Sequence, residues 1–241
     1  MRNVPSSARV ALTAFMAFNI FGSADFSAYG IFLSPEQTFT AEFIILLAGE
    51  ALLGIITGFY ISIVFSAFSA AGQFFAFQMG FSASEVYDAL SQVENPLMGQ
   101  YLNLIAMLVF MQTGLFQKLF LGGLVSSFKT LNAYSIVNAM ASGAFLPRFF
   151  MRSLTELFAN ALVISLPIMG TLSLITISTG ILSKAAPQMN LLSEGFPVML
   201  LVSFFILTAL MPSLIDAFAR SFDGGFARLE QLFLVLGGKK L

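Results

Sequence analysis

The side chains that could carry chemistry are few in this sequence of 241 residues. The chain has no His and no Cys, which removes the commonest metal ligands, the usual general base and the thiol nucleophile. Charged residues lie at or near the ends of long apolar runs, and Glu50 and Lys184 come closest to membrane depth. We expect both at a membrane edge, Glu50 at the mouth or bend of its helix and Lys184 capping helix carbonyls or extending outwards. The sequence predicts no catalytic residue, no cofactor and no metal ligand.

Five amide side chains inside apolar stretches are also informative. An amide is costly in lipid unless it bonds to another helix, so these residues predict helix faces that meet protein. They are Gln73, Gln78, Asn103, Gln112 and Asn160.

The composition indicates a membrane-integrated or membrane-assembled protein. Hydrophobic residues make up 58% of the chain and charged residues 10%, against about 25% charged in soluble domains. The mean hydropathy is +0.90. A net charge of −1 argues against nucleic acid as a partner, because no basic face could neutralise phosphates.

Residues 51–84 contain no charged side chain. As a helix this stretch would be roughly 50 Å long, whereas the hydrocarbon core of a bilayer is about 30 Å thick. The segment must therefore break, tilt strongly or continue into a partner that excludes water.

Helices are expected wherever the apolar runs are long enough. Pro167 should kink the helix that contains it. The run at 10–22 follows Arg2 and Arg9 and fits either a signal-peptide core or a helix packed on other protein. The expected helical ranges are 10–22, 41–79, 101–128, 148–183 and 195–215.

The segment 213–241 differs from the rest because apolar residues recur at close to helical period with charges between them. This pattern predicts an amphipathic helix at an interface, with Gly224-Gly225 as a candidate break. Elsewhere, the GxxxG spacing of Gly54 and Gly58, extended by Gly72, favours close helix packing. Residues 79–100 contain acidic residues, Gly and Pro and are expected to form a loop.

Two short stretches carry distinctive motifs. The first is Ala71-Gly72-Gln73, then Gln78-Met79-Gly80 and an acidic loop ending at Asn95-Pro96. The second is a turn motif with Pro187, Gln188 and Asn190, followed by Gly195, Phe196 and Pro197. Together with Glu50, Gly54 and Gly58 on one helix, these motifs resemble the FliR family of the bacterial type III export apparatus, which includes the injectisome SctT proteins.

The resemblance implies an all-α protein of long, partly kinked hydrophobic helical hairpins packed into a multi-subunit export gate. One copy would assemble with five FliP and four FliQ subunits, with FlhB around the base and membrane lipid outside. The assembly would sit in the bacterial inner membrane at the flagellar basal body, partly on the periplasmic side. Unfolded flagellar proteins would pass through it.

In that family the loop after the QMG motif projects into the channel and helps to close it. Carried to this sequence, the channel or plug loop begins at Gly80 and Ser82, with Phe81, Val86 and Tyr87 as apolar candidates. Relatives often carry Phe two residues after this Ser, where this chain has Ser84.

Two other functions fit a polytopic chain. A stand-alone transporter or channel would need a polar pathway and deep ionisable residues, which these runs lack. A membrane-embedded enzyme would need a His, Asp or Glu constellation at membrane depth, which is also missing.

Overall fold

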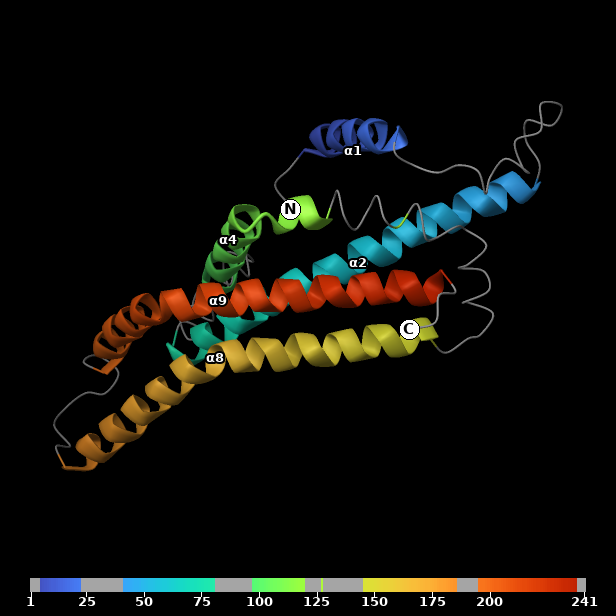
Figure 1. Cartoon of the computed structure of the whole chain (residues 1–241). Helices are drawn as coiled ribbons and strands as arrows, with labels where there is room; N and C mark the ends of the chain where they lie inside the picture. The colour runs from blue at the N-terminus through green and yellow to red at the C-terminus, as the bar shows by residue number, and fades with distance from the viewer. Residues whose placement is uncertain are drawn as a thin grey trace, which may run out of the picture. The chain divides into compact units, whose positions relative to one another are not determined.

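The computed structural model describes residues 5–22, 41–80, 97–119, 127, 145–185 and 195–237. Almost all of these residues are helical and none of them is in a strand (Figure 1). The prediction of an all-α protein is therefore confirmed. In chain order the helices are α1 (Ser6–Phe21), α2 (Ala41–Gln78), α4 (Leu97–Gln112), α5 (Leu115–Gln117), α8 (Phe145–Ala185) and α9 (Phe196–Leu236).

Among the described residues, three helices are long and apolar enough, by length and composition, to cross a membrane: Phe43–Gln78, Leu146–Ala185 and Pro197–Leu236. Helix α2 has 38 residues without interruption, a length of roughly 57 Å. Helix α2 is thus unbroken as far as Gln78, and a helix of this length must tilt or continue into a partner to keep its apolar surface out of water.

The chain divides into two compact units, each assembled from several separate segments. The first comprises Met1–Thr57, Phe116–Leu146 and Phe226–Leu241. Its buried side chains lie in the first half of α2, at Leu119 and near the end of α9. No residue of α1, which is described throughout, is buried, so its apolar surface is uncovered.

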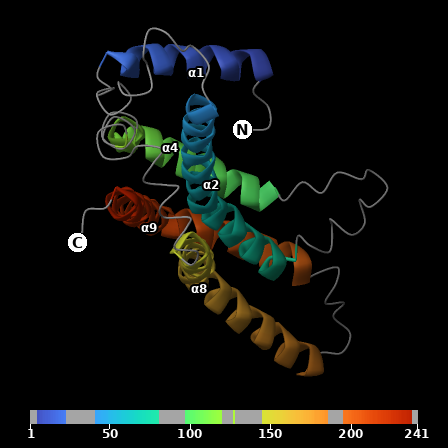
Figure 2. The same cartoon turned by 90° about the vertical axis from the view of Figure 1, so that its right-hand side faces the viewer.

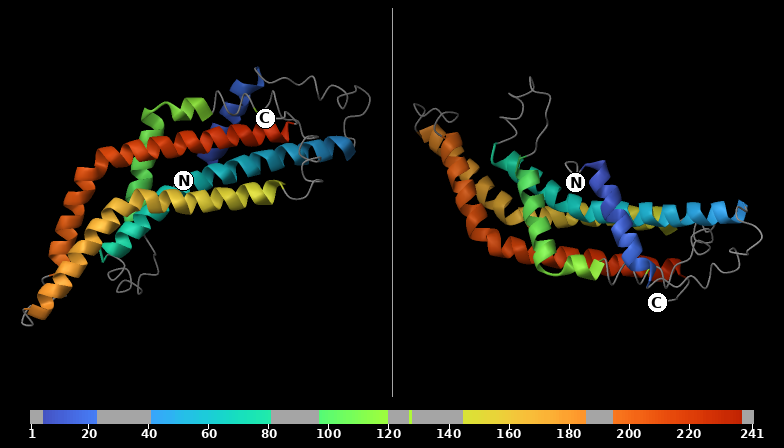
Figure 3. Two further views of the ribbon diagram at one scale, coloured as in Figure 1. Left: turned by 60° about the horizontal axis from the view of Figure 1, so that its bottom comes forward. Right: turned by 90° about the horizontal axis from the view of Figure 1, so that it is seen from above.

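The second unit comprises Gly58–Leu115 and Pro147–Gly225 and contains the main core. Within it, α4 crosses α2, and α8 runs beside α9 (Figures 2 and 3). We call residues 58–78, 97–112, 147–166 and 213–225 the inner bundle. Phenylalanines fill its centre: the rings of Phe68 and Phe218 lie 4.6 Å apart and those of Phe68 and Phe222 4.8 Å apart, and all three side chains are fully buried.

Helices α8 and α9 both change direction along their length (Figures 1 and 3). Each has one proline in its interior, Pro167 in α8 and Pro212 in α9. Proline removes a backbone donor and its ring clashes with the preceding turn, which is the usual cause of such bends. The predicted kink of α8 is therefore present.

Residues 168–185 and 195–211, beyond the two prolines, form the part of the hairpin that we call the distal arm. Only Ile168, Leu172, Ser203 and Leu207 are buried among its described side chains. Large apolar residues on both helices are exposed instead, up to 71% at Leu201 and 72% at Phe205. The arm is therefore a thin pair of helices with an uncovered apolar surface.

The second half of α9 continues directly from the apolar run before it, so residues 213–236 do not form a separate helix. The helix is also not broken at Gly224-Gly225. Gly225 packs against α2, where an added Cβ would lie 3.0 Å from Val64 Cγ2, and its carbonyl accepts a bond from the Tyr60 hydroxyl at 2.9 Å. These contacts compensate for the weak helix propensity of glycine.

Candidate functional site

The end of α2 is the described part of the predicted channel loop. Helix α2 stops at Gln78, and Gly80 follows with φ 81°, a left-handed conformation that glycine adopts without strain. The Gly80 amide donates to the Phe77 carbonyl at 3.2 Å, which closes the helix end. The glycine of the QMG motif therefore terminates α2 where the loop is expected to begin.

The remaining loop candidates, Phe81, Ser82, Val86 and Tyr87, lie outside the described residues. At the other side of the loop, α4 begins at Leu97, whereas the sequence predicts loop as far as residue 100. The reason is the close packing of Gly99 on α2, where an added Cβ would lie 3.0 Å from the Ser69 carbonyl oxygen. That contact holds the first turn of α4 in place.

Gln78 also joins the end of α2 to α8. Its Nε2 donates to Ser173 Oγ at 3.0 Å, across 95 residues of sequence. A second amide, Asn160, donates from α8 to Ser221 Oγ of α9 at 3.5 Å. Two of the five amides predicted to meet protein thus meet other helices of this chain.

Gly72 marks the closest approach between helices. A Cβ added there would lie 2.5 Å from the Met98 carbonyl oxygen and 2.6 Å from Gly99 Cα, so any side chain would strike backbone. Gly54 and Gly58 differ, since nothing in the described part of the chain comes within 4 Å of a Cβ at either position. Of the three glycines expected to pack helices, Gly72 packs within this chain and the other two face open space.

The second family motif marks the start of α9. Pro187, Gln188 and Asn190 lie outside the described residues, while Gly195, Phe196 and Pro197 lead into the helix. Proline suits the first turn of a helix because the amides there have no intrahelical partner. The GFP portion of the motif is therefore a helix start.

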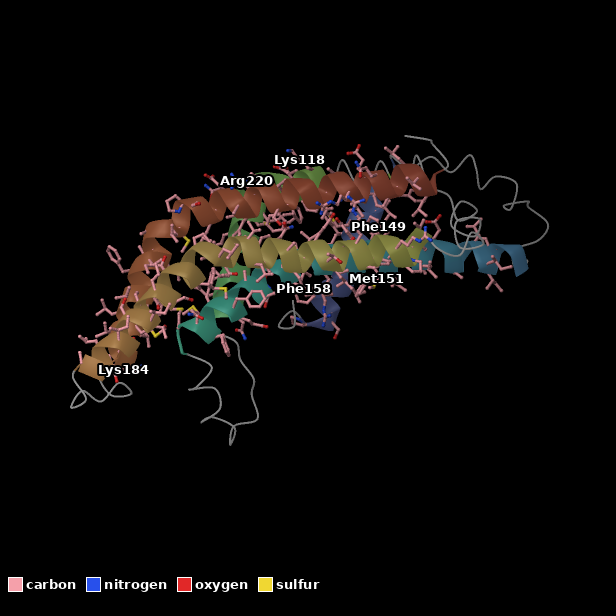
Figure 4. The ribbon with its side chains drawn as sticks, turned by 90° about the horizontal axis from the view of Figure 1, so that it is seen from below. Lys118, Phe149, Met151, Phe158, Lys184 and Arg220 are labelled. Carbon is pink, nitrogen blue, oxygen red and sulfur yellow. The ribbon has the colours of Figure 1, made fainter. Side chains whose placement is uncertain are left out.

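The two charged residues predicted to lie at a membrane edge are in different settings. Glu50 is half-buried in the first half of α2. Lys184 is exposed in the last turn of α8, at the tip of the distal arm, where a cation is favourable beside the helix carbonyls (Figure 4).

The aromatic centre of the inner bundle is the feature that the sequence did not reveal. Phe65 joins it, with its ring 5.0 Å from that of Phe222 and 5.4 Å from that of Phe110. Spacings of three residues between Phe65 and Phe68, and four between Phe218 and Phe222, place each pair on one helix face. Those spacings were the available signal, but 29 phenylalanines in the chain obscure it.

The described polar contacts at this site join helices to one another. In the described ranges, no group of three or more His, Cys, Asp or Glu could hold a metal ion. The polar contacts at the site are neutral hydrogen bonds between amides, hydroxyls and carbonyls. Such bonds position helices relative to one another.

Comparison with known proteins identifies the family of this chain. The family model described as "Bacterial export proteins, family 1" matches residues 1–225. The chain belongs to this family of bacterial export proteins, which confirms the resemblance drawn from its two motifs.

Individual relatives give the same result. The chain is 33% identical to the flagellar biosynthetic protein FliR of Borreliella burgdorferi over 72% of this chain and 64% of the relative. It is 28% identical to FliR of Bacillus subtilis over 98% of this chain and 88% of the relative. It is also 28% identical to the surface presentation of antigens protein SpaR of Shigella sonnei, over 66% of this chain and 59% of the relative.

Proposed function

We propose that this chain is a structural, pore-forming subunit of the flagellar type III protein export gate. Unfolded flagellar proteins would cross the bacterial inner membrane through the gate that it helps to form. The observation that carries the proposal is the family match over residues 1–225, and the match to FliR of Bacillus subtilis over 98% of the chain favours the flagellar form.

The exposed apolar surface supports a place inside an assembly. Side chains such as Ile55, Leu174 and Phe205 are more than half exposed although they are large and apolar. An exposed apolar surface of this extent marks contact with protein or with lipid. We infer that sister subunits supply most of that cover, with one copy of this chain beside five FliP and four FliQ subunits and FlhB at the base.

The open glycines support the same inference. Gly54 and Gly58 lie one helical turn apart on α2 with no described neighbour within 4 Å of either Cβ position. Small residues at this spacing let a second helix backbone approach closely. We assign this face of α2 to contact with a neighbouring subunit.

The proposed mechanism is passive gating by the loop that starts at Gly80. Apolar side chains at a constriction would seal the channel against ions, because a polar solute must shed water to enter. Phe81, Val86 and Tyr87 are the candidates for this seal, and an exported chain would push the loop aside. The proposal assigns no catalytic step, cofactor or metal to this chain, and its complex would lie at the flagellar basal body, partly on the periplasmic side.

Deletion of residues 81–94 tests this function. The glycine stop at Gly80 and the α2–α4 contact at Gly72 lie outside the deletion, so the helices retain their packing. We expect the complex to assemble at normal mass while the membrane becomes permeable to ions, measured as dye-reported ion flux in reconstituted vesicles. A deletion variant that stays tight to ions and still exports would contradict the proposal.

A further inference from the structure

The prolines of α8 and α9 lie at nearly the same level of the hairpin. Asn160 is bonded to Ser221, which aligns the two antiparallel helices. Seven residues further along α8 is Pro167, and seven residues back along α9 is Leu214. Pro212 is two residues from that point, a displacement of about 3 Å along the axis.

Each proline removes one backbone hydrogen bond from its helix at this level. A proline has no amide proton, so Val163 in α8 and Thr208 in α9 lose the usual amide donor to their carbonyls. Bending costs least where a helical hydrogen bond is already missing. The hairpin therefore has a paired weak point between the inner bundle and the distal arm.

Packing on the two sides of this weak point is unequal. The inner bundle encloses fully buried Phe68, Phe218 and Phe222, whereas the distal arm has few buried side chains. Regions with few buried apolar contacts are the ones that open and move at low cost in free energy. The bonded pair of Gln78 Nε2 and Ser173 Oγ ties the arm to the end of α2.

We propose that the distal arm pivots as one body about Pro167 and Pro212, and that the Gln78–Ser173 hydrogen bond is the latch that holds it. Gln78 is the last residue of α2, two residues before the glycine that opens the predicted channel loop. Movement of the arm would thus act on the base of that loop. This coupling to the channel rests on the proposed function, whereas the pivot does not.

A neutral hydrogen bond of this kind changes a two-state equilibrium by about five-fold. That size suits a latch, since it holds the arm in one position without preventing release. Because the chain has no cysteine, introduced cysteines can be labelled uniquely.

The pivot can be measured by electron spin resonance between two labels, first in the full chain purified in detergent, where no sister subunit packs on the arm, and then in the assembled complex. Lys184→Cys at the arm tip and Arg220→Cys on the inner bundle report the arm position, and both native residues are exposed (Figure 4). Thr155→Cys with Arg220→Cys is the control pair within the inner bundle, since Thr155 is also exposed. In this background we expect one dominant distance for each pair.

Ser173→Ala removes the latch oxygen. We expect the population at a second arm distance to rise about five-fold, with the control pair unchanged. Ser173→Thr retains a hydroxyl and should keep the wild-type distance distribution of the arm pair. Pro167→Ala should narrow that distribution, because it restores the backbone hydrogen bond to the Val163 carbonyl. An unchanged arm distance in Ser173→Ala, or equal broadening of both pairs, would overturn the pivot.

Ion flux separates the two parts of the proposal. We expect Ser173→Ala to raise ion flux through reconstituted complexes and Ser173→Thr to leave it at the wild-type level. If the arm moves and flux does not, the coupling to the channel is overturned. If the deletion of residues 81–94 leaks and Ser173→Ala neither moves nor leaks, the proposed function survives and this inference fails.

Discussion

The inner bundle and the distal arm use the same two helices in opposite ways. In the inner bundle, α8 and α9 bury Leu157, Ala161, Phe218 and Phe222 with α2 and α4 beside them. In the distal arm the same helices remain apolar but bury little. Equally apolar stretches of these two helices therefore form a core within this chain in one region and an exposed surface in the other.

The difference shows why hydropathy alone describes this protein poorly. All three long helices have a mean hydropathy of 2.0 to 2.4 in their most apolar windows, yet only 17% to 28% of each window is buried. Close approach and ring packing distinguish the core, and both depend on single residues.

Replacement of Gly72 by Leu should have the largest effect. The new Cβ would lie 2.5 Å from the Met98 carbonyl oxygen and the other near atoms are also backbone, so α2 and α4 must separate. We expect a loss of more than about 5 kcal/mol in the free energy of unfolding in detergent, above the usual range for overpacking because backbone atoms cannot move aside. Thermal unfolding followed by circular dichroism measures it.

Gly54→Leu is the matched control, because nothing in the described ranges lies within 4 Å of its Cβ position. It should leave the stability of the isolated chain unchanged or raise it slightly, since leucine is a better helix former than glycine. Equal losses for both variants would remove the distinction between the two glycines.

Truncation of Phe222 should come next. Its side chain is fully buried, with ring centroids at 5.0 Å from Phe65, 4.8 Å from Phe68 and 5.3 Å from Phe110. Phe222→Ala should cost about 3 to 5 kcal/mol in the free energy of unfolding if the site does not collapse, and less if it does. The measurement is chemical denaturation of the purified chain in detergent.

Phe205→Ala removes the same ring from the distal arm, where Phe205 is 72% exposed. The isolated chain should lose little stability, while binding to neighbouring subunits should weaken. If Phe205→Ala destabilised the isolated chain as much as Phe222→Ala, the arm would have a core of its own and the comparison would fail.

The sequence predicted the helices better than their contacts. The expected helix 41–79 agrees with α2 to within one residue at its C-terminal end, because a long uncharged apolar run bounded by the helix-stopping Gly80 leaves little choice. The sequence did not predict that the run 195–215 and the segment after it form one helix, because Pro212 and Gly224-Gly225 are residue types that commonly end a helix. Contacts such as Tyr60 with Gly225 hold the helix together and cannot be read from neighbouring residues.

The candidate site was predictable where a motif has a backbone role. Gly80 and Pro197 act through the backbone at a helix end and a helix start, so the motif itself indicates the structure. The partner of Gln78 was not predictable, because Ser173 is one of several hydroxyl residues on α8 and only the packed helices bring it within 3.0 Å. Gly72 and Gly54 look alike in sequence, and only the position of α4 separates them.

A smaller effect is expected at Tyr60, which donates to the Gly225 carbonyl at 2.9 Å and is almost fully buried. Tyr60→Phe keeps the ring against Phe149, at 5.2 Å between centroids, and removes only the hydroxyl. We expect a loss of about 1 kcal/mol in the free energy of unfolding. A loss as large as that of Phe222→Ala would mean that the bond, and not ring packing, holds α9 to α2.

The smallest effect is expected for the ion pair of Arg152 and Glu156, whose Nε and Oε1 atoms lie 3.1 Å apart one turn from each other on α8. Arg152 is 80% exposed, so solvent screens the pair and Arg152→Gln should cost only a few tenths of a kcal/mol. A salt titration of the unfolding midpoint should differ little between variant and wild type. A loss above about 1 kcal/mol would show that a neighbour shields the pair from solvent.

The mass of the complex extracted in mild detergent, after co-expression with FliP and FliQ, shows what packs on the apolar surface of this chain. Sister subunits are proposed to cover the apolar surface of the distal arm and the open glycine face of α2. We predict one copy of this 26.1 kDa chain in a particle with five FliP and four FliQ subunits. A stable particle that contains this chain alone, with detergent or lipid as its only cover, would contradict it.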